Sequence, residues 1–280
     1  MTWRVRVRHT TGYRYDSEVT ASYNEARLVP QTGPSQLTLE STVVTTPRAK
    51  QQRYWDYWGT QVTSFDLHVP HTELEVTATS VVETADAAPP PTDCTWEQLR
   101  SEQVRDEHVE LLVPSPRAVP DDDLLGAAVE LVRPTPYDTV RAVVEAVHER
   151  VAYRPGSTGV STNAVEAWHL GAGVCQDIAH VSLALLRATG VPARYVSGYL
   201  HPGGERAAVG DTVAGESHAW VEVYLGRWWG YDPTNAQPAG ERHVVVARGR
   251  DYADVPPLKG VYAGGGSQSL GVVVEVTRLA

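Results

Sequence analysis

The sequence contains little cysteine: Cys94 and Cys175 are the only two among its 280 residues. Two thiols cannot build the disulfide framework that stabilises many small secreted proteins. They are also too few for a structural zinc site unless several histidines join them. We therefore expect two free thiols, no bound metal and no cofactor.

Long apolar runs are also missing. The first eight residues alternate between apolar and polar or basic side chains, unlike the continuous apolar stretch of a signal peptide. No segment approaches the ~20 apolar residues that a membrane-spanning helix needs. These absences predict a cytoplasmic protein that does not enter a membrane.

Basic residues are outnumbered by acidic ones. Lys and Arg total 24 against 34 for Asp and Glu, which gives a net charge of −10. Nucleic-acid binding depends on basic side chains that neutralise phosphates, so we expect no nucleic-acid partner. We interpret the acidity as a property that keeps the protein soluble.

Two catalytic motifs are absent. No Gly-x-Ser-x-Gly segment supports a serine hydrolase. No His-Glu-x-x-His segment supports a zinc peptidase, and His68 and His71 lie in strand-like sequence interrupted by Pro70. No acidic loop has the character of a calcium site.

The first part of the chain has the pattern of β structure. Apolar and polar residues alternate over 3–8, 37–40, 62–69 and 74–82. Short strands separated by turn residues, without helices between them, predict a small antiparallel β-sandwich-like domain over residues 1–88. Residues 86–93 contain three consecutive prolines and predict a linker at its end.

The second part has helical periodicity first and strand patterns later. The spacing predicts helices over 95–112, 121–132, 138–151 and 175–188, and strands over 194–200, 218–224 and 228–232. Helices packed on an antiparallel sheet make the class α+β. We expect this core to span residues 89–250, with residues 251–280 forming a C-terminal loop and strand that close the fold.

Cys175 occupies a position where a thiol is easily activated. It follows a glycine-containing turn and begins the helix predicted over 175–188. The helix dipole and the unpaired N–H groups at a helix N-terminus favour the thiolate. The position alone fits a nucleophile and a buried core cysteine about equally well. Cys94 lies beside the proline-rich linker, and we expect it to be exposed.

A cysteine nucleophile needs a base, and His218 begins a predicted strand where a rigid imidazole can be presented. Residues 225–227 predict a tight turn that returns the chain along this strand. Residue 218 should then lie opposite 233 or 234, so Asp232 can reach His218 across the hairpin. A carboxylate there would fix the imidazole tautomer. Considered alone, His218 could be a core residue and Asp232 could be a turn residue.

The sequence also resembles the transglutaminase-like superfamily, which has a papain-like fold. The motifs that carry the resemblance are residues 173–180 (GVCQDIAH), 193–200 (ARYVSGYL), 217–224 (SHAWVEVY) and 232–235 (DPTN). Residues 155–158, 249–257 and the N-terminal β region resemble segments of the bacterial members, so the resemblance covers nearly the whole chain. It implies a catalytic triad of Cys175, His218 and Asp232.

The oxyanion that forms during acyl transfer needs hydrogen-bond donors. The backbone N–H of Cys175 is one expected donor. Gln176 and Trp168 are candidate side-chain donors because they are near in sequence. His180 lies more than one helical turn from Cys175, and we interpret it as a structural residue or one that supports the site from behind.

A triad of this kind predicts acyl transfer through a thioester on a peptide or carboxamide substrate. If water accepts the acyl group, the enzyme is a cysteine peptidase or amidase, and the resemblance to bacterial members favours this outcome slightly. If an amine accepts it, the enzyme is a transglutaminase. The alternative is a non-catalytic binding or assembly module with a vestigial triad. A peptide or protein is the expected partner.

Overall fold

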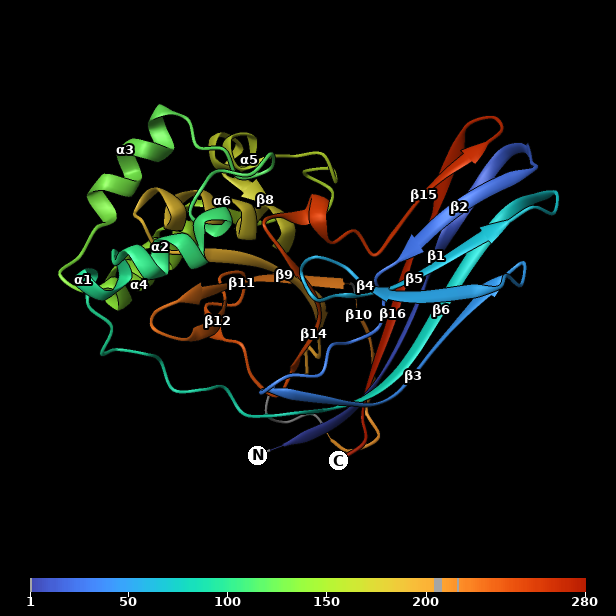
Figure 1. Ribbon diagram of the computed structural model, residues 1–280, viewed down its shortest axis with the longest axis horizontal. Coiled ribbons are helices and arrows are strands. Elements are labelled where there is room, and N and C mark those ends of the chain that lie inside the picture. Colours follow the sequence, from blue (N-terminus) through green and yellow to red (C-terminus); the bar gives the residue numbers. More distant parts are fainter. Residues whose placement is uncertain (1, 204–207, 216) are drawn as a thin grey trace.

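A computed structural model describes residues 2–203, 208–215 and 217–280, and Figure 1 shows two lobes. One lobe consists of long strands, and in the other lobe helices lie on one side of a second sheet. The predicted α+β class, an N-terminal β-sandwich-like part and a core of helices on an antiparallel sheet, is confirmed. Among the described residues, the helices are all too short or too polar to cross a membrane.

The strand-rich lobe begins with the first part of the chain. Its strands there are β1 (Trp3–Val19), β2 (Ala21–Ala26), β3 (Gln36–Thr46), β4 (Gln51–Trp55), β5 (Gln61–Leu67) and β6 (His71–Thr84). Along β1, residues 3 to 9 alternate between buried and exposed, as in a strand with one face in the core. An apolar core that includes Leu28, Phe65 and Leu74 lies between the two sheets of this lobe.

The end of the chain returns to this lobe, as the red strands beside the blue ones show in Figure 1. β15 (Leu258–Ala263) pairs with β2, and β16 (Ser267–Arg278) pairs with β1. β10 (Thr212–Gly215) pairs with the other side of β16. The two sheets therefore have the orders β10-β16-β1-β6-β3 and β15-β2-β5-β4. The strand-rich lobe needs strands from both ends of the chain.

The helices of the other lobe are α1 (Trp96–Leu99), α2 (Glu102–Glu107), α3 (Asp122–Leu131), α4 (Pro136–Arg150), α5 (Ala164–Leu170) and α6 (Cys175–Ala188), with 3₁₀ turns η1 (Val109–Leu111) and η3 (Tyr252–Asp254). The single helix predicted over 95–112 is wrong. The Ser101 hydroxyl accepts the Val104 N–H and starts a new helix, so the segment is divided. Pro136 begins α4, where its missing N–H costs no hydrogen bond.

The second lobe is organised around a five-stranded antiparallel sheet. Its order is β13 (Gln237–Pro238), β12 (Trp228–Asp232), β11 (Ser217–Tyr224), β9 (Ala193–Leu200) and β14 (His243–Gly249). Helix α6 packs against β11 and β9 on one side and against α3, α4 and α5 on the other. It is therefore buried on nearly every face from Asp177 to Arg187. A central buried helix gives its first residue a fixed position.

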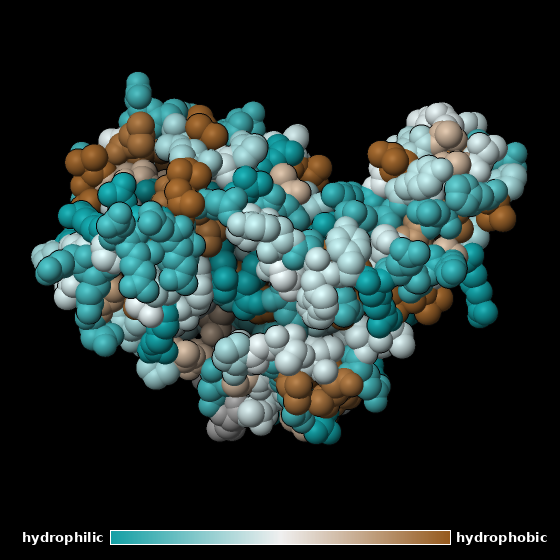
Figure 2. Space-filling view, in the orientation of Figure 1, coloured by the Kyte–Doolittle hydropathy of each residue, from teal (hydrophilic) through white to brown (hydrophobic). Residues whose placement is uncertain are grey.

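The two lobes share one hydrophobic core. Val5 and Val7 of β1 belong to the same buried cluster as Leu183 of α6 and Val221 of β11. On the face that Figure 2 shows, hydrophobic residues form separate groups over the helices and over the strand-rich lobe, with hydrophilic surface between them. This face therefore lacks the single broad apolar patch that marks many stable interfaces.

Candidate active site

Cys175 is the first residue of α6, as its sequence pattern predicts. The carboxylate of Asp177 accepts the backbone N–H of Val174 at 2.8 Å and so holds the start of the helix. Gly173 is required immediately before this turn, because a Cβ there would lie 2.7 Å from Cβ of Asp177. The glycine thus allows the helix start to fold tightly enough to present the thiol.

His218 lies near the start of β11, between β9 and β12. Gly226, with a φ of +78°, allows the tight turn that joins β11 to β12. The register pairs Val221 with Tyr231, so residue 218 falls opposite residue 234 by continuation. The extended register agrees with the predicted partner position, 233 or 234, although β12 ends at Asp232 and the next residues form a turn. Asp232, two residues away, projects from the same face of the hairpin as His218.

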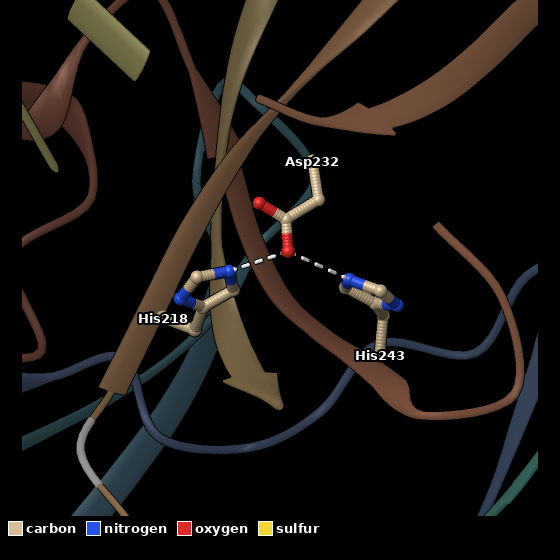
Figure 3. A group of neighbouring side chains, drawn as sticks. All are labelled: His218, Asp232 and His243. Carbon is tan, nitrogen blue, oxygen red and sulfur yellow. Dashed lines mark hydrogen bonds and ion pairs between the residues drawn. The ribbon is translucent and has the colours of Figure 1, made fainter. Parts of the chain in front are cut away.

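The side chains of His218 and Asp232 form a direct hydrogen bond (Figure 3). Nε2 of His218 lies 2.8 Å from Oδ2 of Asp232. Oδ1 of Asp232 accepts the backbone N–H groups of Thr234 at 3.0 Å and Asn235 at 3.2 Å. Oδ2 also accepts the Asn235 side-chain amide at 2.8 Å. Asp232 is fully buried, and these bonds allow its carboxylate to stay charged there.

The hydrogen bonds determine the charges at this site. Burial alone would lower the pKa of His218, but hydrogen bonds to Asp232 and Cys175 raise that pKa to about 10. Burial alone would raise the pKa of Asp232, but hydrogen bonds from His218 and His243 hold it far below its usual range. At neutral pH the site therefore contains an imidazolium beside a carboxylate.

An open pocket of about 360 Å³ lies over Cys175 and His218. Its described lining consists of Tyr153, Cys175, Leu200, Pro202, Gly215, Ser217, His218, Thr234 and Asn235. Apart from Cys175 and His218, the lining consists of side chains that are neutral at pH 7. Sγ of Cys175 lies 3.9 Å from the backbone oxygen of Ser217, at the edge of β11. The pocket therefore presents the thiol and the imidazole together to solvent.

The sequence reasoning did not identify two residues of this site, Tyr153 and His243. Tyr153 comes from the short strand β7 (Ala152–Tyr153), which pairs in parallel with β8 (Ala172–Gly173) directly before Cys175. His243 comes from β14 and lies 3.2 Å from Oδ2 of Asp232 through Nε2. Both depend on contacts between distant segments. The only local signal is that Tyr153 precedes residues 155–158, which resemble bacterial family members.

Comparisons with known proteins identify the family of the chain. Residues 5–83 match the model of the bacterial transglutaminase-like N-terminal region, and residues 127–233 match that of the transglutaminase-like superfamily. An uncharacterized protein of Mycobacterium leprae is 47% identical over 279 residues, covering 99% of this chain and 100% of that protein.

The chain belongs to the transglutaminase-like superfamily.

Two further similar proteins are informative. The crystal structure of a "Putative Cysteine Protease from Cytophaga hutchinsonii" has a TM-score of 0.78 and 24% identity, covering 100% of this chain and 92% of that one. It shows that the whole two-lobed fold occurs elsewhere. A protein-glutamine gamma-glutamyltransferase of Pseudomonas aeruginosa is 35% identical over 127 residues, which cover 40% of this chain and 19% of that protein.

Gln176 and Trp168, the two candidate side-chain donors for the oxyanion, do not line the pocket over Cys175. The Gln176 amide donates to the backbone oxygen of Val160 at 3.3 Å. Trp168 is buried in α5, with the Arg150 guanidinium 4.1 Å from its ring centroid. The backbone N–H of Cys175 lies in the first turn of α6, where N–H groups have no intrahelical acceptor.

Two other residues singled out in the sequence have structural surroundings. His180 is buried in α6, and its Nε2 accepts the backbone N–H of Tyr252 at 3.2 Å. The prediction that Cys94 is exposed is wrong: it is 7% exposed and belongs to the main hydrophobic core. α1 begins directly after it and contributes Leu99 to the same core, although the preceding prolines suggested a free linker.

His218, Asp232 and His243 are also close enough to be considered as metal ligands, since their donor atoms lie within 4.8 Å of one another. Both Nε2 atoms point at the same carboxylate oxygen, at 2.8 and 3.2 Å. Zinc would need its own position about 2.0–2.2 Å from each ligand atom. The two hydrogen bonds occupy that space, so this set fits a hydrogen-bonded cluster better than a metal centre.

Proposed function

We propose that this protein catalyses acyl transfer through a thioester on Cys175, with His218 as acid and base and Asp232 as the residue that orients His218. The observation that carries the proposal is the chain of contacts from Asp232 to His218 beside Cys175 at the base of one pocket. A protonated imidazole next to a thiol favours the thiolate by simple charge attraction.

The chemistry proceeds in two steps. The Cys175 thiolate attacks the carbonyl carbon of an amide, and a C–S bond forms. The C–N bond then breaks as His218 gives its proton to the leaving amine. In the second step water or a primary amine attacks the thioester and gives a proton to His218. Cys175 leaves as the thiolate, and the imidazolium and thiolate are restored together.

The N-terminus of α6 supplies the electrostatic component. The negative oxygen of the tetrahedral intermediate would form next to the Cys175 backbone N–H, at the positive end of the helix dipole. The pocket lining suggests the acyl group. Tyr153, Leu200 and Pro202 offer apolar surface, and Thr234 and Asn235 offer neutral polar groups. An uncharged acyl side chain, such as a carboxamide or an aromatic group, fits this lining best.

Hydrolysis of a peptide or carboxamide is the outcome we expect first, with transfer to an amine as the other form of the same chemistry. The name of the Pseudomonas aeruginosa relative suggests the second form. A binding module with a vestigial site is the remaining alternative. The complete Cys175, His218 and Asp232 set argues against it, since a decayed site is expected to lose one of the three.

The test compares the wild type with Cys175→Ala on casein and on a peptide library, with and without a primary amine, read by mass spectrometry. Cys94→Ala is the matched control because it removes the other thiol. Cleavage or ammonia release that disappears only in Cys175→Ala would establish a thiol hydrolase, and incorporation of the amine would establish a transglutaminase. Activity that survives in Cys175→Ala would overturn the proposal.

A further inference from the structure

Asp232 holds a second histidine besides His218. The imidazole of His243 reaches the same oxygen, Oδ2, from the opposite side, at 3.2 Å from its Nε2 (Figure 3). The two rings come from different strands, His218 from β11 and His243 from β14, and neither strand pairs with the other. The carboxylate of Asp232 therefore connects the catalytic hairpin to the far edge strand of the sheet.

The hydrogen bonds of His243 identify its tautomer. Nδ1 of His243 lies 3.1 Å from the backbone nitrogen of Gly240, which is a donor, so this ring nitrogen accepts and carries no proton. The ring proton is then on Nε2 and is donated to Asp232. Burial is the main cause that lowers the pKa of His243, which agrees with a neutral ring. His243 thus differs from His218, which is charged on the other side of the same oxygen.

The surroundings of His243 leave it little freedom to move. It is 5% exposed, and its ring meets the ring of Trp220 edge-on at 5.2 Å between centroids. Trp220 is itself almost fully buried and lies two residues from His218 on β11. A rigid ring that donates to Oδ2 prevents the carboxylate from rotating away from His218. Because Oδ2 accepts this second hydrogen bond, less of its negative charge is available to stabilise the protonated His218.

We propose that His243 is a positioning residue for the acyl-transfer site: it fixes the Asp232 carboxylate against His218 and limits how strongly Asp232 holds the His218 proton. This inference rests on the proposed function, because it assigns His243 a part in the same reaction. His243 does not line the pocket, and its ring centroid lies 6.3 Å from that of His218, so its hydrogen bond to the site is the one to Asp232.

Two substitutions separate the hydrogen bonds of the two ring nitrogens of His243. In His243→Gln the amide nitrogen lies about as far from the backbone as Nε2, so it keeps a donor for Asp232. In His243→Asn the amide lies near the place of Nδ1, so its oxygen keeps the bond from Gly240 while the donor to Asp232 is lost. His71→Asn is the control for loss of a buried imidazole, since His71 lies in β6 of the other lobe.

We expect His243→Asn to lower kcat by about 10–100-fold with KM within about twofold, because the acid–base group is misplaced while the pocket is intact. The alkaline limb of the pH profile should move to higher pH. Oδ2 then accepts from one imidazole fewer, so it holds the proton of His218 more strongly. His243→Gln should restore kcat to within about threefold of wild type. His71→Asn should leave both quantities unchanged.

The measurement that separates the two proposals is the rate of Cys175 alkylation by iodoacetamide from pH 4 to 11, which needs no substrate. If Cys175 in the wild type reacts no faster than an ordinary thiol at every pH, the proposed function fails. If wild-type Cys175 reacts as an activated thiol and folded His243→Asn matches it in pH profile and kcat, the role of His243 is overturned while the proposed function stands.

Discussion

The hydroxyl of Tyr199 and the imidazole of His9 meet where the two lobes join, with 3.0 Å between Tyr199 Oη and His9 Nδ1. Tyr199 lies on β9 and pairs with Ser217 of β11, while His9 lies on β1 of the strand-rich lobe. His9 is 1% exposed and its Nε2 has no hydrogen-bond partner among the described residues. The site's sheet is thus joined to the other lobe through a buried neutral histidine.

This contact predicts that the protein loses stability in weak acid. Burial lowers the pKa of His9 from 6.5 to about 4, so between these values the unfolded chain binds the proton and the folded chain does not. The free energy of unfolding should therefore fall as the pH falls from 6.5 to 4, by on the order of 3 kcal/mol from His9. Urea unfolding at pH 7, 6 and 5 measures it. His9→Asn should show a shallower decline, and an identical slope would count against this assignment.

Asp232→Asn should shift the pH dependence of the reaction. The amide keeps the volume but cannot hold His218 as an imidazolium, so burial dominates and the pKa of His218 falls from about 10. The alkaline limb of kcat/KM should move to lower pH, and kcat should fall by roughly 10²–10⁴-fold. Asn is a better probe than Ala, which would leave five hydrogen-bond donors around Asp232 without an acceptor. An unchanged limb would remove Asp232 from the mechanism.

The two thiols should react very differently with iodoacetamide at pH 6. Cys175 lies in the open pocket beside His218, whereas burial and the nearby Asp93 raise the pKa of Cys94. We expect labelling of Cys175 at least about tenfold faster than labelling of Cys94 in the folded protein. Peptide mapping by mass spectrometry assigns the label. Equal, slow labelling of both would contradict an activated Cys175.

Tyr153 should matter for substrate more than for folding. Its side chain is 51% exposed and lines the pocket next to Cys175. Tyr153→Ala should lower kcat/KM by roughly 10–100-fold through lost contact with the acyl group, with an unfolding free energy within about 1 kcal/mol of wild type. Tyr23→Ala is the matched control, since Tyr23 is 50% exposed on the other lobe. Equal effects of the two substitutions would show that Tyr153 has no special role.

The residues of the candidate triad could be predicted because each signal is local. A helix start after glycine locates Cys175, and one tight turn at Gly226 brings Asp232 to His218. The same reasoning could not find His243 or Tyr153, since strand pairing between distant segments leaves no mark on local periodicity. The exposure of Cys94 was misjudged for a related reason. Consecutive prolines predict an extended backbone, but they do not indicate whether neighbouring residues are buried by other parts of the chain.

The pairing partners of the C-terminal strands could not be predicted from the sequence either. A C-terminal strand that closes the fold was expected, but the pattern of residues 1–88 does not indicate that both β15 and β16 complete its sheets. The capping pair Asn163 and Glu166, in contrast, was a local signal for α5 that the periodicity reasoning overlooked.

The course of the chain has a practical consequence. The helices and the five-stranded sheet are inserted between β6 and β15, while β1 and β2 are held by strands from the opposite end. The connecting segment at 85–95 also lies against β12, where the Trp229 indole donates to the backbone oxygen of Ala88 at 3.1 Å. A protease that cuts this segment should therefore yield two fragments that remain associated through these strand pairs. For the same reason, the intact two-lobed protein is the smallest unit to express.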